Sequence, residues 1–293
     1  MRAVKEKANA KINLYLDVIA LREDGFHDIK TVMHSVSLSD EITIYYTQSS
    51  VTNIRMRLKG NRYLPIDEKN LAVRAARLYL EMAHKTANIE IKLDKRIPVA
   101  AGLAGGSSDA AATLRAMNRL FGKMFTERAL FEMAAMLGSD VPYCLYGKTA
   151  LCEGRGEIIT KLPDTVRLNV VVATANEHVS TPTAYGKLDE MYSSFDGSVN
   201  SCGGEHYKEL VLSLENGRFS SKSLFNIFEK AVLPACPKAS LIKERMYELG
   251  ASAALMSGSG PSVFGIFESE KTANSACEAL RAEKIMAYSV KSV

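Results

Sequence analysis

Apolar and polar side chains alternate near the start of the chain. Between Lys11 and Val18 the even-numbered positions are aliphatic, and the odd-numbered ones are Lys, Asn, Tyr and Asp. A period of two is typical of a strand with one buried and one exposed face. We therefore predict a half-buried strand here, and further strands over 29–37 and 41–47.

Helical spacing replaces the alternation after Asn70. Asparagine is well suited to accept hydrogen bonds at a helix start. An apolar stripe follows it at Leu71, Ala75, Leu78 and Met82. We predict a helix that begins here and packs with this stripe inward.

Alternation returns over 89–94, and two amphipathic helices follow. The first runs from about Ala110 to Phe121 and the second over 127–137, and Gly122 and Gly138 supply their stops. An aspartate, Asp109, stands near the start of the first helix, where a negative charge complements the helix dipole.

The last third of the chain mixes helices and strands. We predict helix 238–249, strand 252–257, a glycine turn, strand 262–268, helix 270–282 and strand 286–292. This order indicates an α+β fold. The Ser/Gly-rich stretch 193–204 is predicted to be a loop.

Composition narrows the class of protein. The 293 residues are 47% hydrophobic and 24% charged, as in a soluble globular protein. The 37 basic and 33 acidic residues are scattered, which argues against a nucleic-acid or membrane partner. Five irregularly spaced cysteines form no CxxC pair, and the N-terminus has no apolar leader. We therefore expect a cytoplasmic protein with reduced cysteines.

A glycine-rich loop between the strand 89–94 and the next helix carries the most chemistry. Its glycines let a ligand approach the backbone, and the helix start favours an anion such as the phosphates of ATP. Its serines add hydroxyls for phosphate oxygens or Mg²⁺. A tight turn that only permits close packing is the alternative. The loop consists of Pro98, Val99, Ala100, Ala101, Gly102, Leu103, Ala104, Gly105, Gly106, Ser107 and Ser108.

This loop resembles the phosphate-binding motif of the GHMP kinases, P-x-x-x-G-L-G-S-S-A, although relatives often have glycine at Ala104 and alanine or asparagine at Asp109. The strand segment Ala10–Asn13 and the glycine turn Met256–Val263 resemble two further motifs of that family. The resemblance implies an N-terminal domain similar to ribosomal protein S5 domain 2 over 1–160. It also implies a ferredoxin-like C-terminal domain over 161–293, whose last strand can return to the first domain.

Four local strings resemble one branch of this family. That branch uses ATP to phosphorylate the 2-hydroxyl of a cytidine-diphosphate-linked methylerythritol, which yields ADP and serves the non-mevalonate route to isoprenoid precursors. The substrate is thus expected to be a small molecule, and the protein a monomer or weak homodimer. The strings are Arg22–Asp28, Asn70–Arg77, Gly138–Pro142 and Ser180–Tyr185.

The resemblance also implies two catalytic residues. Asp140 would be the general base for the substrate hydroxyl, and Lys11 its cationic partner. From the sequence alone the favoured interpretation of Asp140 is a solvated turn aspartate, and an exposed strand lysine is the alternative for Lys11. Mg²⁺ is expected to bridge the ATP phosphates, and no residue is assigned as a metal ligand.

Ligand contacts follow from the same resemblance. Asn13 would contact the diphosphate or hydroxyls of the substrate, Phe26 and Tyr185 would stack on its cytosine, and His27 would read the base edge. Core packing is the alternative for both aromatic rings. The adenosine pocket would be lined by Asn70, Leu71 and Lys95.

Other functions stay open at this point. A GHMP kinase for another alcohol, such as mevalonate or homoserine, shares the loop. A non-catalytic nucleotide-binding regulator could use the same scaffold, although it has no need for both Lys11 and Asp140. An RNA-binding protein ranks last because no basic stripe is present.

Overall fold

The computed structural model describes residues 2–60, 63–174, 177, 179–191 and 203–293. Most of the predicted loop 193–204 lies outside these residues. Two compact units are formed, one by residues 1–10, 38–99 and 104–147, the other by 11–37, 100–103 and 148–293. Strands β1 and β2 contribute residues to both units. The predicted domain boundary at 160 stays a prediction.

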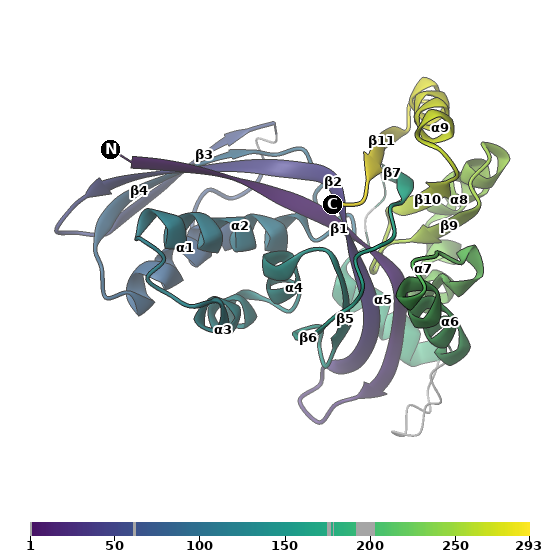
Figure 1. Ribbon diagram of the computed structural model, residues 1–293, viewed down its shortest axis with the longest axis horizontal. Coiled ribbons are helices and arrows are strands. Elements are labelled where there is room, and N and C mark those ends of the chain that lie inside the picture. The colour runs from purple at the N-terminus through teal and green to yellow at the C-terminus, as the bar shows by residue number, and fades with distance from the viewer. Residues whose placement is uncertain (1, 61–62, 175–176, 178, 192–202) are drawn as a thin grey trace. The chain divides into compact units, whose positions relative to one another are not determined.

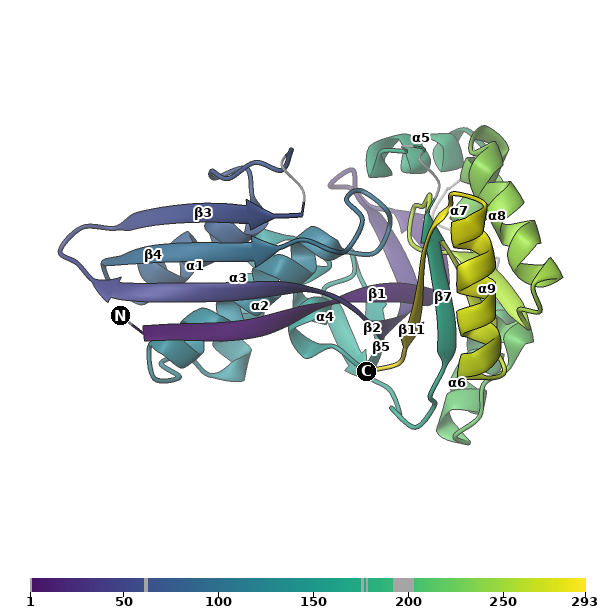
Figure 2. The same cartoon turned by 90° about the horizontal axis from the view of Figure 1, so that it is seen from above.

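The first unit is a sheet covered by helices on one face. Within it β3 pairs with β4 in parallel and β2 pairs with β4 in the antiparallel direction. Figure 2 shows β3, β4, β2 and β1 side by side, with α1 to α3 on one face. Its elements are β1 (Arg2–Leu21), β2 (His27–Gln48), β3 (Asn53–Lys59), α1 (Leu71–Met82), β4 (Ala87–Asp94), α2 (Gly105–Leu120), α3 (Glu127–Leu137) and α4 (Val141–Tyr146).

The second unit contains a four-stranded antiparallel sheet with the order β11-β7-β10-β9. The order of strands and of helices α8 and α9 along the chain is that of a ferredoxin-like domain, as predicted (Figure 1). The elements are β5 (Thr149–Glu153), β6 (Ile158–Lys161), β7 (Asn169–Thr174), α5 (Thr181–Met191), α6 (Gly204–Glu215), β8 (Phe225–Asn226), α7 (Phe228–Val232), α8 (Pro237–Glu248), β9 (Ala253–Met256), β10 (Val263–Phe267), α9 (Glu270–Ala282) and β11 (Met286–Lys291).

Several elements agree with the sequence patterns. The helix 127–137 has the predicted bounds, and the five elements expected after residue 237 are all present within a residue or two. Asn70 caps α1 as predicted, because its Oδ1 accepts a hydrogen bond from the Ala72 amide. Local spacing sufficed here because each element has one apolar face and a clear start or stop.

Two expectations about these elements are wrong, and the strands predicted over 29–37 and 41–47 are confirmed but joined into one. The strand at 11–18 is not half-buried, because Lys11, Asn13 and Asp17 are buried along with the aliphatic face. The runs 29–37 and 41–47 belong to one long strand, β2. In α1 the buried face holds Ala72, Ala76, Tyr79 and Leu80, while Met82 is exposed, so the predicted stripe is rotated around the helix.

None of the helices in the described part of the chain combines the length and apolar character that a bilayer span requires.

Candidate functional site

The predicted phosphate loop is a series of turns that leads directly into α2. Ala100, Gly102 and Ala104 all have positive φ angles, of 52°, 76° and 54°. Ala104 is the N-cap of α2, and its methyl side chain offers no acceptor to the first amides of the helix. These amides therefore have no side-chain acceptor at the N-cap, and with the positive end of the helix dipole they favour an anion.

Glycine is required at position 102 by its surroundings. A Cβ atom there would lie 2.1 Å from the carbonyl oxygen of Ser257. The Gly102 carbonyl in turn accepts hydrogen bonds from Lys11 Nζ at 2.9 Å and from Ser257 Oγ at 3.0 Å. The phosphate loop, the strand β1 and the glycine turn after β9 thus meet at one carbonyl group.

Lys11 is a buried lysine whose hydrogen-bond acceptors are all neutral. Only 4% of the residue is exposed. Besides Gly102, its Nζ donates to Asn13 Oδ1 at 2.7 Å. The Asn13 amide is held from its other end, because Nδ2 donates to Thr31 Oγ1 at 2.8 Å. In the described part of its own unit, Lys11 has no carboxylate partner, so its positive charge is available to an anionic ligand.

The glycine turn after β9 is fixed by Asn226, a residue that sequence reasoning missed. Asn226 Nδ2 donates to the carbonyls of Met256 and Gly258 at 2.7 and 2.8 Å. A Cβ on Gly258 would lie 3.2 Å from Lys11 Nζ, so this turn approaches the lysine closely. Asn226 carries no local motif, and only the parallel pairing of β8 with β1 brings it here.

Lys95 is the second buried lysine, and it has two carboxylate partners. Its Nζ lies 2.5 Å from Asp40 Oδ2 and 2.7 Å from Asp109 Oδ2. Asp40 Oδ1 also accepts hydrogen bonds from the Arg96 and Ile97 amides, at 2.6 and 2.8 Å. This network therefore holds the chain just before the phosphate loop to the first turns of α2.

Asp109 lies in the first turns of α2, near the helix start as predicted. It is buried, and its Oδ1 has no hydrogen-bond partner. Burial raises the pKa of Asp109 to about 8; the ammonium of Lys95 opposes this rise, and the carboxylate of Asp40 adds to it. To the predicted place near the helix start the structure thus adds a tertiary contact with Lys95, which helps to determine the environment of Asp109.

The other predicted adenosine residues lie at the start of α1. Asn70 uses its side chain to cap α1 and to donate from Nδ2 to the Pro65 carbonyl at 2.9 Å. Leu71 is partly buried, and its Cδ1 would be 3.8 Å from a Cβ on Gly106. The starts of α1 and α2 are therefore neighbours in the first unit, with Lys95 Nζ next to Gly105. Their contact with adenosine stays a prediction.

Asp140 is at the N-terminus of α4, which packs against α2 and α3. It is partly exposed, and its carboxylate does not cap the helix. No hydrogen bond or ion pair engages this carboxylate in the residues that the structure describes. The Asp140 carboxylate is thus available as a proton acceptor. The hydroxyl of Ser108, at the end of the phosphate loop, is by contrast engaged, since its Oγ donates a hydrogen bond of 2.5 Å to the Asn9 carbonyl.

Of the three predicted base-contacting residues, two lie together. The rings of His27 and Tyr185 stack with centroids 4.6 Å apart, and Phe228 contacts Tyr185 edge-on at 4.8 Å. Phe26 is 53% exposed, and the guanidinium of Arg155 covers its ring at 4.9 Å. Phe26 is therefore an exposed aromatic ring that is available for stacking.

The hairpin that carries Phe26 is held by ion pairs. Arg22 binds Asp24 and Asp28 at 3.1 and 2.8 Å, and the Phe26 amide donates to Asp24 Oδ1 at 3.1 Å. These contacts explain the Arg22–Asp28 string in physical terms, because its charged residues set the shape of the turn.

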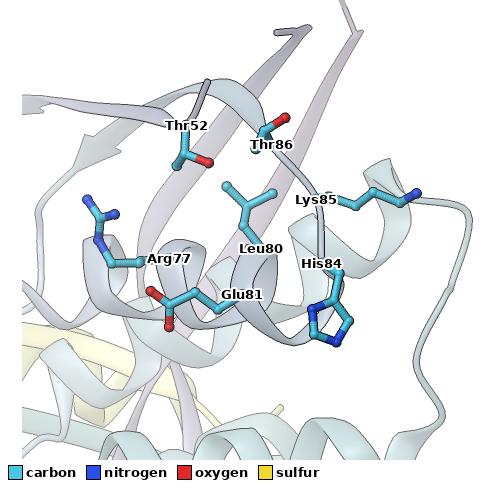
Figure 3. A pocket seen from close by; sticks show the side chains of 7 residues that line it. All are labelled: Thr52, Arg77, Leu80, Glu81, His84, Lys85 and Thr86. Atoms are coloured by element: carbon cyan, nitrogen blue, oxygen red, sulfur yellow. The ribbon is translucent and has the colours of Figure 1, made fainter. Parts of the chain in front are cut away.

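A pocket of about 340 Å³ lies beside the C-terminal end of α1 (Figure 3). None of the predicted site residues lines it. Arg77 is paired with Glu68 at 2.6 Å, and the Thr86 hydroxyl donates to the Ser49 carbonyl at 2.8 Å. The pocket offers no group that the predicted chemistry needs. Its lining residues are Thr52, Arg77, Leu80, Glu81, His84, Lys85 and Thr86.

In the residues that the structure describes, no three His, Cys, Asp or Glu side chains are arranged to hold a metal ion. We therefore assign no residue of this chain as a metal ligand.

Comparisons with known proteins agree with this geometry. Residues 70–148 match the family described as GHMP kinases N terminal domain, and residues 209–285 match GHMP kinases C terminal. The chain is 38% identical over 280 residues to a 4-diphosphocytidyl-2-C-methyl-D-erythritol kinase of Macrococcus caseolyticus, covering 95% of both chains. It is 42% identical over 265 residues to the kinase of that name from a Geobacillus species, covering 89% and 87%.

Solved structures show the same relationship. The crystal structure of a 4-(cytidine 5'-diphospho)-2C-methyl-D-erythritol kinase is similar with a TM-score of 0.81, 33% identity and 99% coverage of both chains. An L. major mevalonate kinase shares the fold, with a TM-score of 0.74 at 14% identity. These similarities confirm the predicted two-domain fold. The chain belongs to the GHMP kinase family.

Proposed function

We propose that this chain phosphorylates the 2-hydroxyl of 4-diphosphocytidyl-2-C-methyl-D-erythritol, a step in the non-mevalonate synthesis of isoprenoid precursors. Like other kinases of its family, it uses ATP. The observation that carries the proposal is the buried ammonium of Lys11, which has only neutral acceptors and is bonded to the phosphate loop at Gly102. Near-full-length similarity to kinases named for this substrate supports the choice of alcohol.

The chemistry needs a base, a cation and a cradle for phosphates. The uncapped amides at the start of α2 bind the phosphates of ATP. Asp140 accepts the proton of the 2-hydroxyl, whose oxygen then attacks the γ-phosphorus as the bond to the ADP oxygen breaks. Lys11 stabilises the negative charge that develops on the transferring group. Mg²⁺ is expected to enter with ATP and would neutralise charge on its phosphates.

The remaining residues have binding roles in this proposal. Asn70, Leu71 and Lys95 belong to the adenosine side, and the capping of α1 by Asn70 supports the position of Leu71. Phe26 and Tyr185 stack on cytosine while His27 reads its edge. Asn13 Oδ1 accepts a hydrogen bond from Lys11 Nζ. Its buried amide, held by Thr31 at the other end, thereby orients the ammonium toward the phosphates and hydroxyls of the substrate.

A coupled assay of ADP release tests the proposed function. The protein is given ATP with the cytidylated methylerythritol, with mevalonate or with homoserine. We expect turnover with the first alcohol and background rates with the others. If the protein turned over only mevalonate or only homoserine, that alcohol would be its substrate instead. ATP binding without turnover of any of the three alcohols would favour the non-catalytic regulator. A cytoplasmic location and a monomeric or weakly dimeric state accompany this proposal as further predictions.

A further inference from the structure

Helix α5 holds the imidazole of His27 at two points. The Tyr185 ring stacks on its face, with an interplanar angle of 28°. Asp189 Oδ1 lies 2.7 Å from its Nε2 atom. Tyr185 and Asp189 are four residues apart and therefore lie on the same face of the helix. One helix thus fixes both the plane of the imidazole and its rotation within that plane.

The contact with Asp189 also determines which nitrogen carries the proton. The Asp189 side chain is 43% exposed, and a carboxylate can only accept hydrogen bonds. Nε2 of His27 must then be the donor. In the described part of the chain nothing hydrogen-bonds to Nδ1, although the side chain is only 7% exposed. The neutral ring therefore keeps an unused lone pair on Nδ1.

We propose that Asp189 is a positioning residue for base recognition, which fixes the Nε2–H form of His27 so that Nδ1 accepts a hydrogen bond from the exocyclic amine of the pyrimidine. This inference rests on the proposed function, because it takes the base to be cytosine. Cytosine has an amine donor at C4, whereas uracil has a carbonyl acceptor there. A bare Nδ1 attracts the first and repels the second, so Asp189 contributes to selection of the base although it does not touch it.

The proton position can be measured without any substrate. Nitrogen-15 NMR of the full-length protein at about pH 8, above the ordinary histidine pKa of roughly 6.5, should show His27 with a protonated Nε2 and a bare Nδ1. In Asp189→Ala the two nitrogen signals should move toward the averaged values of a free imidazole. The matched control is Glu190→Ala, which removes the same charge from an exposed position one residue on. A proton on Nδ1, or on both nitrogens, in the wild type would overturn the proposal.

Kinetics test the consequence for the substrate. Asp189→Ala should raise the KM for the cytidylated substrate about tenfold, the order expected for one hydrogen bond, with the KM for ATP unchanged. Its preference for the cytidine-linked over the uridine-linked substrate should fall by a similar factor. In Asp189→Asn the side-chain carbonyl can still accept a hydrogen bond from Nε2. This variant should therefore keep most of the wild-type KM and most of the preference for the cytidine-linked substrate. An undiminished preference in Asp189→Ala would refute the role in selection. If the wild type turned over neither substrate, the proposed function would fail, and the NMR result would still decide whether Asp189 sets the proton position.

Discussion

The two buried lysines of this chain differ in what surrounds their ammonium groups. Lys95 is 9% exposed and lies between the carboxylates of Asp40 and Asp109. Lys11 is 4% exposed, and its acceptors are the neutral oxygens of Asn13 and Gly102. Both lysines contact the phosphate loop. Lys95 Nζ lies next to Gly105, and Lys11 Nζ donates a hydrogen bond to the Gly102 carbonyl.

This difference separates a structural charge from a functional one. Burying an ammonium is costly unless a negative charge accompanies it. Lys95 has such a charge within the protein, on Asp40, so the network is complete without a ligand. Lys11 has none in the described part of its unit, which is understandable if the negative charge arrives with the substrates. The contrast predicts that the two lysines respond in opposite ways to the same substitution.

The largest effect is expected where Lys11 and Asp140 act together. Asp140→Asn should lower kcat by about 10²- to 10⁴-fold, because the general base is lost, with ATP affinity little changed. Adding Lys11→Met should slow the enzyme little further, since groups that act as a unit are not additive. Rates of the single and double variants would be measured by ADP release. Fully multiplicative losses would show that the two residues act independently.

Lys95→Met should instead destabilise the protein. The substitution leaves the carboxylate of Asp40 buried without its counter-charge, which typically costs about 3–5 kcal/mol. Urea unfolding monitored by circular dichroism would measure the loss. Lys59→Met is the matched control, since Lys59 is 72% exposed and pairs with Asp94 on the surface, where a pair contributes at most about 1 kcal/mol. Similar losses in both variants would contradict the structural role of Lys95.

A smaller effect concerns the pH dependence of stability. Burial raises the pKa of Asp109 to about 8, against about 3.9 in an unfolded chain. Between these values the folded protein holds a proton that the unfolded chain releases, so this group makes stability fall as pH rises from about 4 to about 8, and no further above. Asp109→Asn should therefore reduce the slope of the unfolding free energy against pH in this window by the amount that corresponds to about one proton. An unchanged slope would show that Asp109 is ionised in the folded state.

Sequence patterns predicted the elements with one clear apolar face and missed those set by distant contacts. The helix at 127–137 and the βαβ-type elements after residue 237 have local starts, stops and periodicity. Alternation predicts a half-buried strand at Lys11, and it cannot show that the polar face is buried as well. The buried face of α1 differs from the predicted stripe because α1 packs against α2, where the Tyr79 hydroxyl donates a hydrogen bond to Asn118 Oδ1.

For the candidate site, motifs indicated the loop and its lysine but not the supporting residues. Gly102 and Lys11 were predicted, and their hydrogen bond joins segments 91 residues apart. Asn226 and Asp189 were not predicted, because each acts through a tertiary contact that leaves no local pattern. The ion pairs of Lys95 were likewise hidden, since Asp40 is distant in the sequence.

Single-turnover phosphate transfer by Lys11→Met tests the central contrast most directly. Labelled ATP and the cytidylated alcohol would be bound at saturation, and transfer followed by rapid quench, with urea unfolding of the same preparation. We expect the transfer rate to fall about 10³-fold, the order lost with one charge-stabilising group, and the unfolding free energy to be retained or increased. Wild-type transfer in this variant, or a stability loss like that of Lys95→Met, would contradict the account.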